Sequence, residues 1–458
     1  MTCYLGSALF FAKQSNLSTF WQAFGGLMAQ LACPVFLSLL MVMNTAQAQL
    51  NIEISGVGAS LYPLAVTSFV DEMVVDGSDG TKLTAIVRAD LARSGRFRLI
   101  EQGVAALAET PAPDLALWQQ KGAHALVVGT VLSHGAGNFE VRFRVFDALK
   151  RNSLGGMSLN FTREQVRLIG HKIADAIYTM LLGEPGVFAT RLSYVTRIGN
   201  QFKLIISDSD GGNPQTALSS SEPIISPAWS PDGRKVAYVS FEKRKPIIYV
   251  HDLPSGKRSI ASNLKGNNSA PAWSPDGQFL AFALSRDGNT QVYKAAIDGS
   301  QLQRLSASSA IDTEPRFSAD GKWLYFTSDR GGAPQIYRMS AETGERNEVA
   351  KRVTFKGSYN TSPRISPDDK KLAFISRQAG GVMRLMIQDL NTGEVNNVGT
   401  RDFDESPSFA ANGQYLLYAT RVSGRHVLAA STVDGKAHHI LSLPSGTVRE
   451  PAWGPFLK

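Results

Sequence analysis

Short apolar segments alternate with polar turns through residues 191–458, and the pattern repeats. Each copy holds a proline, an aromatic or apolar anchor, a turn of the Pro-Asp-Gly type and an apolar run. The five full copies are SPAWSPDGRKVAYVS (226–240), APAWSPDGQFLAFALS (270–285), EPRFSADGKWLYFTS (314–328), SPRISPDDKKLAFIS (362–376) and SPSFAANGQYLLYAT (406–420). Successive anchors are 44 residues apart except for one step of 48. This period is typical of β-propeller blades.

Each copy is predicted to form four short strands. In the second copy we expect strands over 272–274, 279–284, 291–297 and 303–305. The turns between them are rich in Pro, Asp, Asn and Gly, which favour tight reversals of the backbone. Four-stranded sheets packed face to face around an axis would bury the apolar runs on both faces.

The two ends of the repeat region complement each other. Residues 191–218 match only the later part of a copy, and the closing EPAWGPF (450–456) matches only the first part. Together they predict a sixth blade whose innermost strand comes from the C-terminus, which leaves no open sheet edge around the ring.

Residues 49–183 show no repeat and alternate between strand and helix patterns. We expect strands over 62–69, 97–100, 125–132 and 139–146, and helices over 82–93 and 115–121. A last helix follows Thr162, which forms a predicted capping box with Gln165. The predicted fold class is therefore an α/β N-terminal domain (49–183) and a linker (184–190), followed by an all-β six-bladed propeller (191–458) closed by its C-terminal strand.

The first 48 residues have the composition of an export signal. Lys13 is their one charged residue, an apolar stretch follows, and Ala46-Gln47-Ala48 fits a cleavage site before Gln49. The alternative is a membrane anchor, for which the apolar stretch is short. Both cysteines, Cys3 and Cys33, lie in this segment. The predicted mature chain therefore has no disulfide, thiolate metal site or cysteine nucleophile.

Charge and motifs exclude several functions. The net charge is +8, but no basic stripe with interleaved aromatic residues is present, so we do not expect nucleic acid as a partner. No hydrolase, zinc-protease or phosphate-loop motif occurs. None of the seven histidines has ligand spacing to a carboxylate. Asp208-Ser209-Asp210-Gly211 lacks the later ligands of a calcium loop and reads as a hairpin turn. We predict neither an enzyme nor a metal or cofactor site.

The segments that enter the innermost strands are polar and differ from blade to blade. In a propeller they gather around the central channel on one face, where a partner could dock. The candidate residues are Glu222, Asn267, Asn268, Ala270, Thr313, Glu314, Asn360, Thr361, Asp404, Glu405 and Glu450. The alternative reading is simple solvation and capping of strand ends.

A second candidate binding segment is the predicted mature N-terminus, 49–57. Apolar residues alternate there with polar ones, a period of two that suits an added edge strand. The candidates are Gln49, Leu50, Asn51, Ile52, Glu53 and Ile54. This segment could equally be an ordinary first strand of the N-terminal domain.

Taken together, these features resemble the TolB family of periplasmic propeller proteins of the Tol-Pal system. The resemblance rests on the export signal, the N-terminal strand segment, the join GVFATRLSYV (186–195), the repeats and the closing EPAWGPF. It implies a periplasmic adaptor that binds the lipoprotein Pal through the propeller face and TolA through the N-terminal segment. Such a protein supports outer-membrane integrity and cell division. Other envelope proteins are possible partners, and membranes would be met only through partners.

Within this resemblance, the family's docking residues match Asn267, Asn268, Ala270, Thr313 and Glu314. The family often has His where Asn267 stands, and the fifth copy has Ala411-Asn412-Gly413 in place of Pro-Asp-Gly. The alternative functions are a propeller lectin or an accessory propeller of a peptidase or polysaccharide lyase. A peptidase would need a hydrolase domain, a lyase a histidine cluster, and a lectin aromatic residues at the rim.

Overall fold

The computed structural model describes residues 52–54, 61–72, 78–100, 106–441, 443 and 446–457. The predicted signal peptide (1–48) and the candidate residues Gln49, Leu50 and Asn51 lie outside the described residues. No helix in the described ranges is long and apolar enough to cross a membrane.

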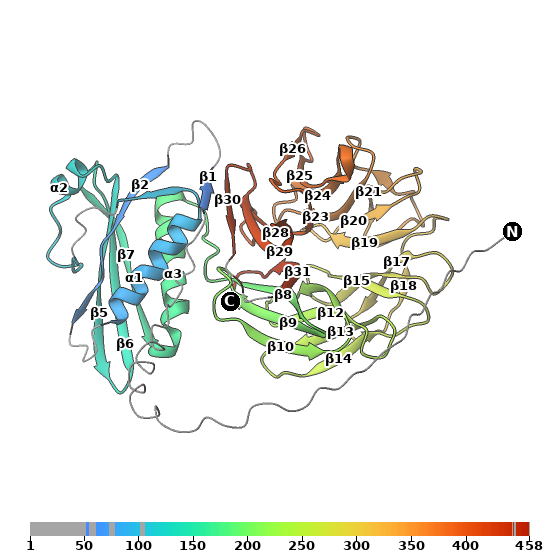
Figure 1. Ribbon diagram of the computed structural model, residues 1–458, viewed down its shortest axis with the longest axis horizontal. Coiled ribbons are helices and arrows are strands. Elements are labelled where there is room, and N and C mark those ends of the chain that lie inside the picture. Colours follow the sequence, from blue (N-terminus) through green and yellow to red (C-terminus); the bar gives the residue numbers. More distant parts are fainter. Residues whose placement is uncertain are drawn as a thin grey trace, which may run out of the picture. The chain divides into compact units, whose positions relative to one another are not determined.

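The N-terminal α/β domain is a mixed sheet in the strand order β4-β2-β5-β6-β7, with β3 also paired to β5. Helices α1 and α3 pack against each other on this sheet (Figure 1). Their apolar residues, among them Leu83, Val87, Ile173 and Ile177, form one core with the sheet. The elements are β2 (Tyr62–Val66), β3 (Val70–Glu72), α1 (Asp79–Arg93), β4 (Phe97–Leu99), α2 (Leu115–Gln120), β5 (Ala125–Gly135), β6 (Asn138–Asp147), β7 (Asn152–Thr162), the 3-10 turn η1 (Arg163–Gln165) and α3 (Val166–Leu182).

The elements predicted for this domain are confirmed within a few residues, and the capping box between Thr162 and Gln165 is present. One prediction was wrong in detail, and one strand was missed. The predicted strand over 62–69 ends at Val66, and the chain pairs again only from Val70. Strand β7 was not predicted, because it lies at the sheet edge with most side chains exposed and so lacks an alternating pattern.

Residues 191–457 form a six-bladed β-propeller (Figure 1). In five of the blades, the four strands follow one another along the chain. They are β11 (Ile224–Trp229) to β14 (Arg258–Ser262), β15 (Asn268–Trp273) to β18 (Gln303–Arg304), β19 (Asp312–Phe317) to β22 (Lys351–Arg352), β23 (Asn360–Ile365) to β26 (Val395–Asn397) and β27 (Glu405–Phe409) to β30 (Ala437–Ile440). Their middle strands are β12 (Lys235–Ser240), β13 (Ile247–Asp252), β16 (Phe279–Leu284), β17 (Gln291–Ala296), β20 (Trp323–Ser328), β21 (Gln335–Ser340), β24 (Lys371–Arg377), β25 (Met383–Asp389), β28 (Tyr415–Val422) and β29 (Arg425–Thr432). A 3-10 turn, η2 (Ala379–Gly381), joins β24 to β25.

The sixth blade joins the two ends of the propeller, as predicted. Strands β8 (Arg191–Ile198), β9 (Gln201–Asp208) and β10 (Gln215–Ser220) are completed by β31 (Thr447–Trp453). Strand β31 runs antiparallel to β8, with Trp453 opposite Leu192. Leu192, Tyr194 and Val448 are buried in a core shared with the neighbouring blade of β28 and β29.

A β-bulge recurs in every innermost strand. In each copy, the residue before the recurring proline of the innermost strand has a φ between 51° and 57°, and the register to the next strand shifts there. These residues are Ser226, Ala270, Glu314, Ser362, Ser406 and Glu450. The predicted strand at 272–274 therefore starts earlier, at Asn268, because pairing continues on both sides of the bulge.

Strand β1 (Ile52–Ile54) does not belong to the N-terminal domain. It pairs antiparallel with β30, with Ile52 opposite His439 and Ile54 opposite Ala437, and so becomes the fifth strand of the blade β27–β30. The interpretation of this segment as a first strand of the α/β domain was wrong, and it lies instead on a propeller edge.

Candidate partner-binding face

The predicted face residues fall into two groups, buried and accessible. Asn268 and Asn360, the first residues of two inner strands, are fully buried, and so is Asp404 just before β27. Asn268 Oδ1 accepts from Ser262 Oγ at 2.6 Å, and its Nδ2 donates to the carbonyls of Leu264 and Gly266. The amide therefore fixes the loop that precedes β15.

Asn360 and Asp404 do the same in later blades. Asn360 Nδ2 donates to Gln335 Oε1 at 2.8 Å and to the Lys356 carbonyl at 2.9 Å. Asp404 accepts from Leu385 N at 3.0 Å and Thr420 Oγ1 at 2.8 Å, and burial raises its pKa to about 6. These side chains shape the face from inside it. Asn268, Asn360 and Asp404 are thus not placed where a partner could touch their side chains directly.

Two candidate glutamates sit at the bulges and bridge neighbouring blades. Glu314 accepts from Ser362 N and Ser362 Oγ, both at 2.8 Å, and from Thr327 Oγ1 at 2.9 Å. Glu450 accepts from Ser226 N at 3.3 Å across the ring closure. Burial and the Glu405 charge raise the pKa of Glu450. Both carboxylates therefore tie one inner strand to the next.

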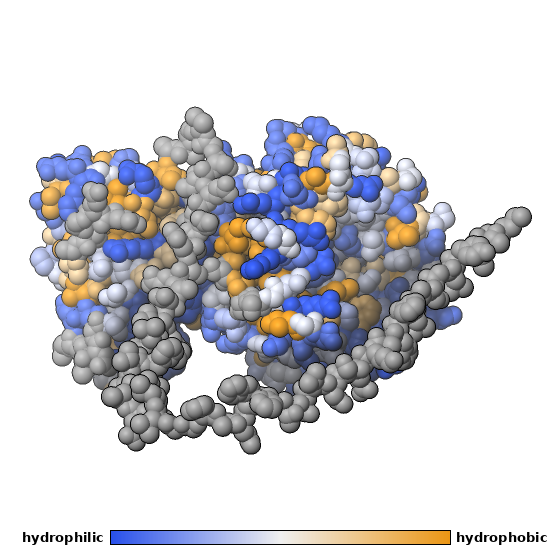
Figure 2. All heavy atoms as spheres, in the orientation of Figure 1, coloured by the Kyte–Doolittle hydropathy of each residue, from blue (hydrophilic) through white to orange (hydrophobic). Residues whose placement is uncertain are grey.

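The remaining candidates are more accessible, apart from Ala270, which is buried. Asn267 is exposed, and Glu222, Thr313, Thr361 and Glu405 are half-buried. Arg449 binds Glu405 through two bonds, Nε to Oε1 at 2.6 Å and Nη2 to Oε2 at 2.5 Å. In the space-filling view, hydrophilic residues predominate on the visible surface and apolar ones form separate small groups (Figure 2).

Comparison with known proteins identifies the family. A family model described as the TolB beta propeller domain matches residues 178–457, and one described as the TolB amino-terminal domain matches residues 50–154.

The chain belongs to the TolB family.

The crystal structure of TolB from Acinetobacter baumannii is 40% identical in sequence, with a TM-score of 0.81. The match covers 89% of this chain and 100% of that one. A putative TolB from Agrobacterium tumefaciens is 18% identical, with a TM-score of 0.46, over 57% of this chain and 91% of its own. Membership of the TolB family associates the chain with the periplasmic Tol-Pal system.

The α/β domain of this TolB-family chain is held to its propeller by an ion-pair network that sequence reasoning missed. Arg167 of α3 donates to Asp208 Oδ2 at 2.8 Å and to Asp210 Oδ2 at 2.7 Å. Asp208 and Asp210 belong to the predicted hairpin turn, which Gly211 N closes by donating to the Asp208 carbonyl at 2.9 Å. His171 lies in the same network, 3.7 Å from Asp208.

Three side chains of this network form the one group of potential metal ligands among the described residues. His171, Asp208 and Asp210 offer ligand atoms within 4.8 Å of one another. Both aspartates, however, already bind Arg167, and Arg93 Nη1 lies 3.8 Å from Asp210. With two guanidinium groups supplying the positive charge, the cluster works as an ion-pair network, in which a metal ion would add further positive charge.

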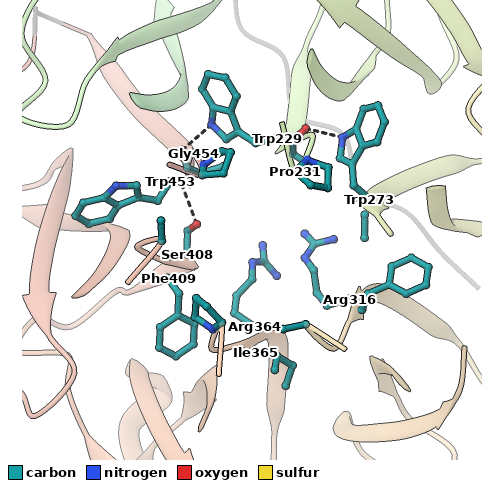
Figure 3. A pocket seen from close by; sticks show the side chains of 18 of the residues that line it. Trp229, Pro231, Trp273, Arg316, Arg364, Ile365, Ser408, Phe409, Trp453 and Gly454 are labelled. Atoms are coloured by element: carbon teal, nitrogen blue, oxygen red, sulfur yellow. Dashed lines mark hydrogen bonds between the residues drawn. The ribbon is translucent and has the colours of Figure 1, made fainter. Parts of the chain in front are cut away.

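The central channel contains a second feature that the sequence reading missed. Arg316 of β19 and Arg364 of β23 point into a cavity of about 410 Å³ (Figure 3). A signal was available in the repeats. The residue before the anchor is Ala or Ser in four copies, and Arg in the third and fourth, which form adjacent blades.

Proposed function

We propose that this chain is a non-enzymatic periplasmic adaptor of the Tol-Pal system. It binds the lipoprotein Pal on the propeller face around the starts of the inner strands, and it binds TolA through the N-terminal segment that includes β1. Through these contacts it supports outer-membrane integrity and cell division.

The rigidity of the propeller face supports the Pal assignment. Buried amides and carboxylates fix the loops at Asn268, Asn360 and Asp404, and the Glu314 carboxylate ties adjacent blades. A preformed surface loses little conformational entropy when a partner docks. Asn267 and Thr313 lie on this surface in adjacent blades, and no hydrogen bond is formed by either side chain among the described residues.

The pairing of β1 carries the TolA assignment. The ladder between β1 and β30 spans three residues, Ile52 to Ile54, against a strand of four. So short a ladder can be exchanged for pairing with a strand of another protein, which is how extended segments bind sheet edges. The N-terminal segment can thus either lie on its own propeller or bind TolA.

The same blade offers a route between the two proposed sites. Strand β1 is followed in the sheet by β30, β29, β28 and β27, and β27 begins with Glu405 on the Pal face. Glu405 in turn binds Arg449 of β31. Removing β1 from β30 would change the packing of this blade. We propose that TolA binding thereby changes the affinity for Pal, and that Pal binding in turn changes the affinity for TolA.

Calorimetric titration of the purified protein with the soluble domain of Pal tests the face. We expect one-to-one binding that Thr313→Arg and Asn267→Arg each weaken at least tenfold, because both place a bulky charge in the interface. Thr392→Arg, at an exposed turn between β25 and β26, is the matched control and should bind like the wild type. Pal binding that ignores both face substitutions would exclude this face.

Deletion of residues 49–57 tests the second site and the coupling. We expect loss of TolA binding and a measurable change in Pal affinity. If TolA binding is lost while Pal affinity stays the same, the adaptor function stands and the coupling is wrong. If neither Pal nor TolA binds the intact protein, a glycan screen would examine the lectin alternative.

A further inference from the structure

Arg316 and Arg364 converge in the channel at the mouth opposite the proposed Pal face. The cavity is lined by the second halves of the inner strands and the turns that follow them, such as Ala228–Pro231 and Arg364–Pro367. All six inner strands run in the same sense along the channel, from the Pal face towards these turns. The two arginines therefore belong to a different site from the Pal face.

Neither guanidinium forms an ion pair with any residue that the structure describes. Arg316 Nη1 donates to the carbonyls of Pro271 at 3.1 Å and Pro315 at 2.8 Å, and Arg364 Nη1 donates to that of Pro363 at 2.8 Å. Within the described ranges no carboxylate lies within 4.0 Å of either group. Other partly buried arginines of this protein do bind carboxylates, as Arg330 binds Asp312 at 3.0 Å. Both guanidinium groups point into the cavity (Figure 3).

The electrostatics of the pair favour an anion. Burial and the repulsion from Arg364 lower the pKa of Arg316, while Glu314 and Glu450 act in the opposite direction from further up the channel. Two like charges in a confined, poorly solvated space are costly unless they are compensated. A carboxylate between them would accept hydrogen bonds from both guanidinium groups, because the fork of N–H donors on a guanidinium matches the two oxygens of a carboxylate.

Large aromatic side chains that are held in place lie around the pair. Trp229, Trp273, Phe409 and Trp453 line the same cavity (Figure 3). Trp229 Nε1 donates to the Ala452 carbonyl at 3.2 Å and Trp273 Nε1 to that of Ala228 at 3.0 Å, so each indole is fixed to the neighbouring blade. A ligand that enters here would therefore meet apolar walls as well as the two arginines.

We propose that this channel mouth binds a carboxylate attached to an apolar group. Arg316 and Arg364 hold the carboxylate, and the aromatic side chains that line the cavity contact the apolar part. The ligand is either the C-terminus of a peptide that ends in an apolar residue or a small free organic carboxylate. This inference does not depend on the proposed binding of Pal or TolA.

The test is a titration of the purified protein, followed by calorimetry and by tryptophan fluorescence, in buffer free of phosphate and sulfate. The probes are acetyl-Ala-Phe with a free carboxylate, its C-terminal amide, benzoate and inorganic phosphate. We expect a carboxylate probe to bind at least tenfold more tightly than the amide. Tighter binding of the peptide acid than of benzoate indicates a chain end, and the reverse order indicates a small carboxylate.

Substitutions assign the site. Arg316→Met and Arg364→Met keep an apolar stem, and each should weaken carboxylate binding at least tenfold. Arg425→Met, on the exposed start of β29, should have no effect. As a check that does not rely on calorimetry or fluorescence, the carboxylate should raise the Tm of the wild type more than that of Arg364→Met. Equal binding of acid and amide, tighter binding of phosphate than of any carboxylate, unchanged affinity in both Met variants, or no binding of any probe would overturn the proposal.

Discussion

His171 Nδ1 lies 2.6 Å from Asp90 Oδ2, and both side chains are almost completely buried. Burial alone would lower the pKa of His171, but the charge of Asp90, the hydrogen bond to Asp90 and the nearby carboxylates of Asp208 and Asp210 outweigh it and raise that pKa to about 9. The imidazole is therefore charged at neutral pH. It joins the α/β domain to the ion-pair network on the propeller turn at Asp208.

The raised pKa of His171 predicts that stability falls at alkaline pH. A group whose folded-state pKa exceeds its unfolded value of about 6.5 stabilises fully below that value, and the contribution is lost as pH rises through about 9. The shift corresponds to about 3 kcal/mol. Urea unfolding at pH 6 and pH 10 should show a larger loss for the wild type than for His171→Gln. Equal losses in the two proteins would contradict the prediction.

Gly95, at the end of α1, should not tolerate a side chain. It has a φ of 65°, and an added Cβ would lie 2.3 Å from the Cβ of Ala437 in β30. Gly122 is a matched control because its φ is 82° and it has open space around it. We expect Gly122→Ala to cost about 1 kcal/mol from backbone strain alone, and Gly95→Ala about 2 kcal/mol more. Similar unfolding free energies for the two variants would show that β30 yields to the added methyl group.

Tyr415 links the two domains through its hydroxyl group. The Tyr415 hydroxyl donates to the Ser94 carbonyl at 3.1 Å and lies 3.2 Å from the Tyr178 hydroxyl. Tyr415→Phe leaves both groups without this partner in a buried site, which should cost about 1–2 kcal/mol. Proteolysis in the segment 184–190 should become faster, since the domains separate more easily. Tyr359→Phe, just before β23, serves as the control, and identical digestion of both variants would refute the link.

Removal of one channel arginine should stabilise the ligand-free protein. Arg364→Met removes a desolvated charge that repels Arg316, at the loss of one bond to the Pro363 carbonyl. Replacing buried charges with apolar groups of similar size is often stabilising, and we expect a gain of about 1 kcal/mol. Chemical unfolding of Arg364→Met measures this gain in the free energy of unfolding, with Arg425→Met as the control. A stability of Arg364→Met below that of the wild type would mean that the Arg364 guanidinium stabilises the blade, which would contradict the prediction.

The repeat made most of the propeller predictable. Strand β16 was predicted at its observed bounds, Phe279–Leu284, because an uninterrupted apolar run lies between two turns of clear chemistry. The start of β15 at Asn268 was missed because the bulge at Ala270 and the proline after it break the pattern. Local sequence thus predicts strands where pairing is regular, and it misses strand ends where a special backbone conformation continues the pairing.

The functional residues were harder to predict than the strands. Burial separates Asn268 from Asn267, yet the two are neighbours of the same residue type, and only the fold shows which one points inward. Likewise, the pairing of β1 with β30 joins segments about 385 positions apart and leaves no local signal. A residue's role at this face depends on long-range packing, which one sequence does not display.

The closure of the propeller by β31 also bears on the order of events in folding. The partners of Arg191–Ile198 on that side are residues 447–453, near the end of the chain. The strands of five blades lie consecutively in the chain, whereas β8 can be paired on its inner side only after residues 447–453 have been made. Without residues 447–453 the inner edge of β8 would be left unpaired, and an unpaired edge strand is open to pairing with other chains.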